Sequence, residues 1–279
     1  MRRVKSRCDG TLRIALAFAL SLLAAGAPIA AQSNVPTRHL FTWEDAVLAG
    51  GFVVTTIAIR PLDLKAEAAL QRPDRQKSHM LKKTAVGLRT IAVPGSLLIG
   101  AGMYATGRLS HQRRLAELGL LGTQALLIGE GTGTLLKDFF GRARPYTDSV
   151  PNPDDWQLMR GFRTNERYRS FPSGHAVAGF AAAAAVTAET SVWWPKRTWI
   201  IGPAMYGGAA LIGLSRMYDN RHWASDIIMG AAIGTFAGTK IVRYHRTNPD
   251  NRLDRWLLNA SVSPSDLGHI SFSVIPLFR

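Results

Sequence analysis

Apolar residues along this chain gather in long blocks, and before the C-terminal tail no block alternates convincingly with period two. Blocks of this length, rich in Ala, Gly, Leu and Ile, predict helices that pack closely against one another. The expected helices span Asp45–Ile59, Thr84–Thr106, Leu115–Leu136, His175–Trp194, Trp199–Leu214 and Ser225–Val242. The pattern therefore indicates an all-α fold, a bundle of about six apolar helices.

Two of the polar segments between these blocks are long. Arg60–Lys83 is highly charged, which predicts a loop or an exposed helix. Gly141–Ser170 contains three prolines and many arginines, so we expect a long loop there. Loops of this length inside compact domains are usually functional. Near the end of the chain, Ile270–Val274 alternates between apolar and polar residues and predicts a short strand.

The N-terminus has the layout of a secretory signal peptide. Basic residues come first, the apolar run Ile14–Leu23 follows, and small residues lead to Ala31. We expect cleavage near Ala31. The alternative is an uncleaved membrane anchor, since Ile14–Ala31 is only just long enough to span a bilayer. Cleavage would remove Cys8, the only cysteine, and so exclude disulfides, cysteine nucleophiles and cysteine metal ligands from the mature protein.

Several blocks approach the length of a membrane span. Suppose that all segments from Thr84 onward span and that the loop 141–170 faces the periplasm. The basic clusters at 108–114, 196–197 and 243–246 then lie on the cytoplasmic side, as the positive-inside rule requires. We expect the shorter block 45–59 to lie on the surface or against the bundle, although this makes the basic segment 60–83 periplasmic, which fits the rule poorly. A membrane-embedded bundle is the favoured interpretation, and a soluble or peripheral helical protein is the alternative.

These patterns divide the chain into a signal peptide (1–31), a lead-in with a short apolar helix and a charged segment (32–83), a helical domain (84–246) and a C-terminal tail (247–279). The expected location is the bacterial inner membrane with a periplasm-facing site, or the periplasm itself. The formal charge of +15, from 34 Lys and Arg against 19 Asp and Glu, favours anionic partners. No aromatic–basic module accompanies it, so nucleic acid is not an expected partner.

Candidate chemistry is concentrated in three segments, each at a helix boundary: Lys137–Pro145 (KDFFGRARP), Pro172–His175 (PSGH) and Ser215–Asp226 (SRMYDNRHWASD). Suppose that consecutive helices run antiparallel. The helices 115–136 and 199–214 then end, and the helices 175–194 and 225–242 begin, at the same end of the bundle. Simple alternation therefore brings all three segments together, and we expect the active site at that end.

The residue types in these segments suit a phosphate. Arginine presents a planar fork that matches phosphate oxygens, and lysine adds a point charge. Exposed N–H groups at a helix N-terminus also attract anions. The candidate phosphate-binding residues are Lys137, Arg144, Ser173, Gly174 and Arg216, with Arg142 as an extra cation.

Two histidines in the same segments, His175 and His222, can move protons or attack an electrophile. Asp226 follows His222 by four residues, so on a helix the two side chains share a face. Asp226 would then accept the Nδ1–H of His222 and leave Nε2 as the nucleophile. Each motif alone also has a plain structural interpretation, as a helix cap or a surface pair, but their order on one predicted face argues against chance.

The combined pattern K-x6-RP, PSGH and SR-x5-H-x3-D resembles the signature of the type-2 phosphatidic acid phosphatase superfamily, which also includes vanadium haloperoxidases and bacterial acid phosphatases. The resemblance covers about Thr84 to Val242 and matches at every defining position. It implies hydrolysis of a phosphate monoester or pyrophosphate with no metal and no other cofactor. His222, oriented by Asp226, would form a phosphohistidine, and His175 would act as general acid and then as general base.

The resemblance and the apolar helices together imply a lipid phosphate or lipid pyrophosphate as the substrate, in a membrane. A soluble periplasmic acid phosphatase acting on small esters is the alternative. A phosphotransferase would use the same residues with an acceptor other than water. A vanadate-dependent haloperoxidase is disfavoured because no extra domain is visible, and a non-catalytic membrane protein is disfavoured because all candidate catalytic residues are present.

Overall fold

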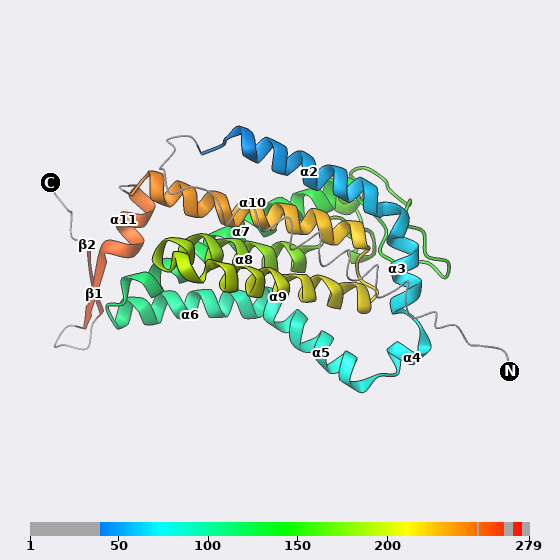
Figure 1. The fold of residues 1–279 in the computed structure, drawn as a ribbon, viewed down its shortest axis with the longest axis horizontal. Coiled ribbons are helices and arrows are strands. Elements are labelled where there is room, and N and C mark those ends of the chain that lie inside the picture. Colours follow the sequence, from blue (N-terminus) through cyan, green and yellow to red (C-terminus); the bar gives the residue numbers. More distant parts are fainter. Residues whose placement is uncertain (1–39, 250, 265–269, 275–279) are drawn as a thin grey trace.

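The computed structural model describes residues 40–249, 251–264 and 270–274 (Figure 1). The predicted signal peptide lies outside the described residues. The longer helices are α2 (Trp43–Ile59), α3 (Asp63–Leu70), α5 (His79–Thr90), α6 (Ser96–Leu109), α7 (Arg113–Phe140), α8 (Gly174–Trp193), α9 (Thr198–Tyr218), α10 (Ala224–Thr247) and α11 (Arg252–Asn259). Shorter elements are η1 (Arg60–Leu62), α4 (Pro73–Gln76), the π-turn η2 (Ile91–Gly95), η3 (Arg160–Phe162), η4 (Glu166–Tyr168) and η5 (Pro195–Arg197).

The predicted all-α fold is confirmed, and α7 to α10 cover the four apolar blocks from Leu115 to Val242. The segment 60–83, expected as a loop or an exposed helix, is a series of short helices. The predicted strand is also present, since β2 (Ile270–Val274) pairs antiparallel with β1 (Ala260–Pro264). The long loop 141–173 contains only the short turns η3 and η4.

Helix α8 is the centre of the bundle and packs against α7, α9 and α10. Six of its eight alanines are buried, and small side chains let neighbouring helices approach closely. The closest neighbour is α10, whose Gly230, Gly234 and Gly238 face the backbone of α8. A methyl group at any of these glycines would collide with α8 backbone atoms, so the α8–α10 contact requires residues without a side chain.

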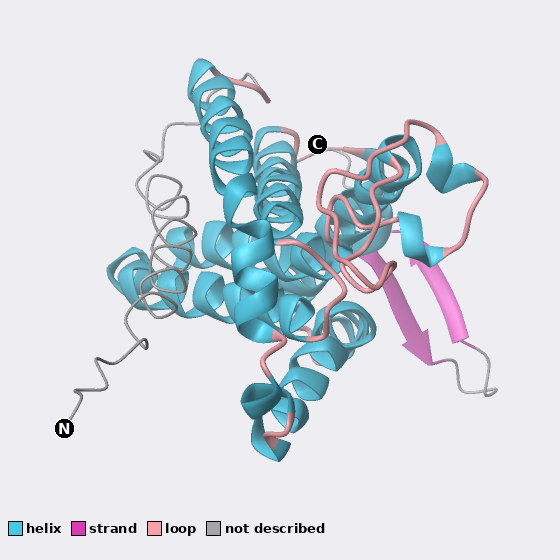
Figure 2. Ribbon diagram, turned by 90° about the vertical axis from the view of Figure 1, so that its right-hand side faces the viewer, coloured by secondary structure: helices cyan, strands magenta, loops and turns pink. Residues whose placement is uncertain are grey.

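The antiparallel alternation expected from the sequence is observed. α7 and α9 end, and α8 and α10 begin, at the right-hand end of Figure 1, which faces the viewer with its loops in Figure 2. Several hydrogen bonds join these ends. The Ser173 N–H donates to the Asp226 carbonyl (3.0 Å), and the Trp223 Nε1–H donates to the Ala143 carbonyl (2.9 Å).

The N-terminal helices wrap around this bundle. α2 packs along α10, and α3 leads to the end of α9. There the side-chain amide of Gln71 donates to the carbonyls of Met217 (3.2 Å) and Tyr218 (3.1 Å), and that of Gln76 donates to Tyr218 (3.0 Å). These bonds supply donors to the Tyr218 carbonyl, one of those that the last turn of a helix leaves unbonded. The Met217 carbonyl also accepts from the Asn220 N–H (3.0 Å).

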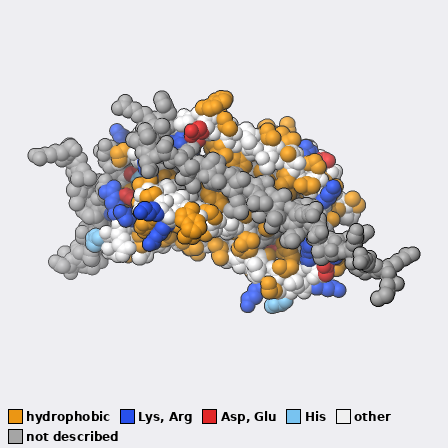
Figure 3. Space-filling view, in the orientation of Figure 1, with side chains coloured by type: hydrophobic (Ala, Val, Ile, Leu, Met, Phe, Trp, Pro, Cys, Tyr) orange, Lys and Arg blue, Asp and Glu red, His pale blue; other side chains and the backbone are white. Residues whose placement is uncertain are grey.

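Three helical stretches in the described part of the chain are long and apolar enough to cross a membrane: Trp43–Leu70, His79–Leu109 and Gly174–Trp193. The first block packs against the bundle as expected. It is longer than expected, because the helix continues through η1 into α3 and reaches 28 residues. Large hydrophobic side chains such as Trp43, Leu98 and Trp199 are more than 70% exposed. Figure 3 shows hydrophobic side chains along much of the visible face.

Candidate active site

The three predicted segments meet at one end of the bundle, as expected. Lys137, Arg144, Arg216 and His222 all lie near His175, which is half-buried in the first turn of α8. Lys137 and Arg144 also lie near His222. Helices α7, α8 and α9 and the loops after α7 and before α10 thus each contribute a charged or titratable side chain to one site.

Gly141 ends α7 and sets the direction of the loop that carries the arginines. Its φ of +53° is left-handed, and its N–H donates to the Lys137 carbonyl (3.1 Å). Glycine adopts this conformation without the steric cost of a side chain. The chain can therefore turn sharply after Lys137 and bring Arg144 back toward the start of α8.

Ser173 occupies the N-cap position of α8 but does not cap it. Its side chain forms no capping hydrogen bond, and its buried Oγ has no partner among the described residues. An N-cap serine normally accepts from an N–H of the first turn. At the next residue, a Cβ on Gly174 would lie 2.6 Å from Lys137 Nζ, so the lysine ammonium occupies the space beside the helix N-terminus. The start of α8 therefore presents unused donors beside a cation.

Among the described residues, the buried Nε donors of Arg144 and Arg216 have no partner. Arg144 Nη2 donates to Glu166 (2.7 Å), and Arg216 Nη1 donates to Asp219 (2.7 Å), so acidic side chains hold both guanidinium groups in place. Burial lowers the pKa of Arg144. Buried donors without partners are rare in proteins, and here they form part of a site that an anion can complete.

His222 is buried in the turn before α10, with its Nδ1 2.7 Å from the Ser170 carbonyl oxygen. Because a carbonyl only accepts, this contact requires the proton on Nδ1 and leaves the Nε2 lone pair free. No described residue hydrogen-bonds Nε2. Burial lowers the pKa of His222 to about 3, so the imidazole is neutral at physiological pH. A neutral imidazole with a free Nε2 is the form that can act as a nucleophile.

Asp226 lies behind His222 but is not the closest acceptor of its Nδ1–H, which differs from the direct pairing expected from the sequence. Its Oδ2 is 3.5 Å from Nδ1 and already accepts from the Ser170 hydroxyl (2.6 Å) and the Trp223 N–H (2.9 Å). Ser170 therefore links the two side chains, since its carbonyl accepts from His222 while its hydroxyl donates to Asp226.

Arg142, expected as an extra cation for the ligand, has a different place. It is fully buried, and all three of its nitrogens donate to protein acceptors. It forms ion pairs with Asp63 (2.7 Å) and with Asp226, and its Nε donates to the Pro153 carbonyl (3.0 Å). With no donor left for a ligand, Arg142 belongs to the framework behind the site.

The sequence reasoning missed Ser170, Asp63, Glu166 and Asp219. Asp63 and Glu166 lie in segments where charged residues are frequent, so nothing in the local pattern separates them from surface charges. Ser170 acts partly through its backbone, which leaves no signal in residue type. Asp219 had one available signal, because it follows Arg216 by three residues at the end of a helix, a spacing that lets side chains meet.

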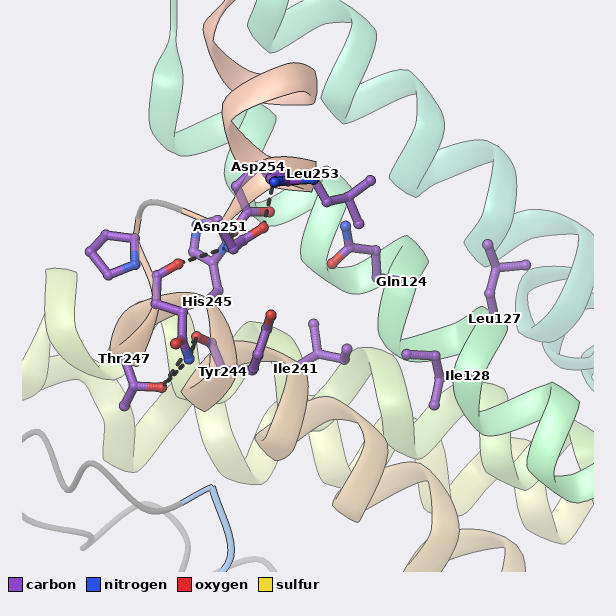
Figure 4. Close-up of a pocket in the computed structure, with 13 residues that line it drawn as sticks. Gln124, Leu127, Ile128, Ile241, Tyr244, His245, Thr247, Asn251, Leu253 and Asp254 are labelled. Atoms are coloured by element: carbon purple, nitrogen blue, oxygen red, sulfur yellow. Dashed lines mark hydrogen bonds and ion pairs between the residues drawn. The ribbon is translucent and has the colours of Figure 1, made fainter. Parts of the chain in front are cut away.

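A pocket of about 1120 Å³ among the described residues lies away from this site (Figure 4). It opens between α7, α10 and the start of α11, toward the other end of the bundle. Leu127, Ile128 and Ile241 line one part, and His245 pairs with Asp254 in another. None of the predicted site residues lines this pocket, so it is separate from the candidate active site.

Residues 119–250 match the model of the PAP2 superfamily. The match contains every candidate site residue and ends near the close of α10. It does not include α2 to α6, so the segment that carries Asp63 lies outside it.

Two curated relatives are phosphatases by name. The lipid A 1-phosphatase of Porphyromonas gingivalis is 41% identical over 113 residues, which is 40% of this chain and 22% of the relative. The undecaprenyl-diphosphatase of Sulfolobus acidocaldarius is 33% identical over 145 residues, which is 52% of this chain and 64% of the relative. The matches thus span about a fifth of the first relative and less than two thirds of the second.

Two solved structures are similar at low identity. Aquifex aeolicus LpxE gives a TM-score of 0.47 at 20% identity and covers 66% of this chain and 96% of its own. The PAP2-type phosphatidylglycerolphosphate phosphatase of Bacillus subtilis gives a TM-score of 0.49 at 18% identity and covers 85% and 98%.

Proposed function

Because residues 119–250 of this chain belong to the PAP2 superfamily, we propose that the protein hydrolyses a phosphate monoester or a diphosphate carried by a lipid, without a metal ion and through a phosphohistidine. One observation carries the proposal. Buried donors without partners, on Arg144, Arg216 and Ser173, belong to the same site as a neutral histidine whose Nε2 is free. The donors suit an anion, and the histidine suits an electrophilic centre on that anion, so the site fits a phosphate ester or a diphosphate.

In the first step, His222 Nε2 attacks phosphorus while the bond from phosphorus to the leaving oxygen breaks. Lys137, Arg144 and Arg216, with the donors of Ser173 and Gly174, hold the phosphoryl oxygens and stabilise their charge in the transition state. His175 gives a proton to the leaving oxygen. The products of this step are the alcohol, or the phosphate monoester left from a diphosphate, and a phosphohistidine with a proton on Nδ1.

In the second step, His175 takes a proton from water as the water oxygen attacks phosphorus. The bond from phosphorus to Nε2 breaks, inorganic phosphate leaves, and His222 returns to its neutral form. Asp226 orients His222 through the Ser170 link in both steps. One group serves as acid and then as base, which requires that His175 lie near the leaving oxygen and the water in turn.

A lipid phosphate is the substrate class that the surroundings support best. The relatives are named for lipid A and for undecaprenyl diphosphate. Three helical stretches have the length and composition of membrane spans. We propose a periplasm-facing site, because basic clusters at the opposite helix ends then face the cytoplasm.

The test is phosphate release by the purified full-length protein in detergent, with EDTA present. Three substrates separate the classes: a long-chain phosphatidic acid, a polyprenyl diphosphate and p-nitrophenyl phosphate. We expect release from one or both lipids, and a loss of about 10⁴-fold or more in kcat for His222→Ala, because the nucleophile is gone.

His245→Ala is the matched control, since His245 also pairs with an aspartate but borders the distant pocket. It should retain wild-type activity. More than a tenth of wild-type activity in His222→Ala would overturn the nucleophile assignment. Release from p-nitrophenyl phosphate alone would indicate a general acid phosphatase. Loss of substrate without phosphate release would indicate a phosphotransferase.

A further inference from the structure

A closed network of charged side chains lies directly behind His222, and it begins at Asp63 in the first turn of α3. Asp63 is fully buried. Its Oδ2 accepts from Arg142 Nη2 (2.7 Å) and from the Ser225 hydroxyl (2.6 Å), and its Oδ1 accepts from the Ser225 N–H (2.9 Å). Arg142 then contacts Asp226, which contacts Ser170. Asp63 is thus connected to the histidine by an unbroken series of hydrogen bonds.

When both carboxylates are ionised, the network carries an excess of negative charge. It contains two carboxylates, Asp63 and Asp226, and one guanidinium, that of Arg142. Among the described residues, Arg142 is the only lysine or arginine paired with either carboxylate. Both carboxylates and the guanidinium are fully buried, where charges interact more strongly than in water. Without Asp63, Arg142 and Asp226 would form a neutral pair.

The excess negative charge affects the step in which His222 Nε2 bonds to phosphorus. When phosphorus bonds to His222 Nε2, the ring keeps the proton that Nδ1 donates to Ser170, so the imidazole becomes a cation. No such cation forms when an anion is held only by hydrogen bonds. A negative charge behind the ring therefore stabilises the covalent state and its transition state more than the bound substrate.

We propose that Asp63 is a positioning residue for this reaction, keeping a net negative charge behind His222 while the bond from Nε2 to phosphorus forms. The inference rests on the proposed function, because it assumes that His222 is the nucleophile. It assigns a part in the chemistry to a residue 162 positions before Ser225 and outside the matched segment 119–250. The N-terminal helices are then part of the site.

A purely structural role makes a different prediction. Asp63 also holds the start of α10 through the Ser225 N–H, and an asparagine at position 63 can still accept that bond through Oδ1. Asp63→Asn therefore removes the charge and keeps the side-chain volume, while its amide nitrogen replaces the oxygen that accepts from Arg142 and from the Ser225 hydroxyl. Asp63→Glu keeps the charge and changes the shape. The two variants separate charge from packing.

The experiment compares two inhibitors of phosphate release by the full-length protein. Vanadate mimics the phosphoryl transition state and would form a bond to His222 Nε2. Inorganic phosphate would be held only by the phosphate cradle, which consists of Lys137, Arg144, Ser173, Gly174 and Arg216. For Asp63→Asn we expect kcat to fall by about ten- to a hundredfold, as for other residues that orient a catalytic group. The inhibition constant for vanadate should rise by a similar factor, while KM and the constant for phosphate stay within about twofold.

Asp45→Asn is the matched control. Asp45 is a second buried carboxylate of the N-terminal helices, paired with Lys240 and Arg243 on α10, away from the site. Its loss should lower thermal stability and leave both inhibition constants unchanged. An Asp63→Asn protein that behaves in the same way, or that loses phosphate and vanadate affinity equally, would overturn the inference.

If Asp63→Asn does not fold, Asp63→Glu provides the test. Its ratio of vanadate to phosphate inhibition constants should stay within about twofold of the wild-type ratio, even if its melting temperature falls. A ratio shifted tenfold or more, with the charge retained, would overturn the inference. Wild-type protein that releases no phosphate would instead overturn the proposed function, so the two failures are distinct.

Discussion

Arg142 and Arg144 belong to one short loop, yet their surroundings are opposite. Every nitrogen of Arg142 donates to the protein, and its guanidinium lies 4.5 Å from the ring centre of Trp156. Arg144 is held by Glu166, which is largely exposed, and keeps its buried Nε without a partner. One side chain is saturated by the protein, and the other has a donor left for a ligand.

The same contrast separates two serines. Ser170 uses both its carbonyl and its hydroxyl within the network behind His222, whereas the Ser173 hydroxyl has no described partner. The difference teaches that hydrogen-bond saturation, and not residue type, distinguishes framework from binding site. Groups whose bonds are complete should matter for stability, and groups with a free donor should matter for binding an anion.

The largest effect on stability should come from Arg142→Met. It leaves Asp63 and Asp226 close together in a buried site without their shared cation. Removing one member of a buried ion pair costs about 3–5 kcal/mol in the free energy of unfolding. Thermal and denaturant unfolding of the detergent-solubilised variant would measure the loss.

Arg113→Met is the control, because Arg113 forms an exposed pair with Glu117 at the start of α7. Exposed pairs of this kind contribute little. An Arg142→Met protein as stable as Arg113→Met would show that the buried network does not support the fold.

For Arg144→Met we expect a small effect on stability and a large effect on activity. Its Nη2 pairs with Glu166, which is 65% exposed, so the free energy of unfolding should change by less than about 1 kcal/mol. Loss of a cation from the phosphate cradle should lower kcat/KM by about 10²-fold or more. Steady-state kinetics together with thermal unfolding would test both parts. A variant that loses stability but keeps kcat/KM would remove Arg144 from the cradle.

The smallest effect is expected for Ser173→Ala. A neutral hydroxyl that donates to a charged phosphoryl group should account for about tenfold in kcat/KM. Because its Oγ makes no capping bond, the melting temperature should not fall, although loss of an ordinary N-cap costs about 1 kcal/mol. A clear drop in melting temperature with unchanged kinetics would mean that Ser173 caps α8 after all.

Much of the bundle could be predicted from the sequence, because helices depend on local residue patterns. The apolar blocks, Gly141 after Lys137 and the proline and serine before Gly174 set most helix boundaries of the central bundle to within a few residues. Alternation of antiparallel helices then predicted that the three motifs meet. The continuous stretch from α2 into α3 does not follow from the pattern, because the charged segment Arg60–Lys83 indicates the end of an apolar helix.

The details of the site were less accessible. The spacing of His222 and Asp226 predicted a direct hydrogen bond, but the Ser170 carbonyl lies closer to Nδ1. The sequence placed Arg142 among the cations for a ligand, and packing turned it inward. Both outcomes depend on which acceptors the loop 141–173 brings near, and residue spacing carries no information about that.

The sequence by itself determined the helices, their order and the three segments that meet at one end, because these follow from periodicity and from short-range spacing. Only the tertiary structure decided which donors are saturated and which remain free. It also decided that Asp63 reaches Ser225 across 162 positions of the chain. The physical reason is that burial forces each polar group to find a partner, and the identity of that partner is set by the packing of distant helices.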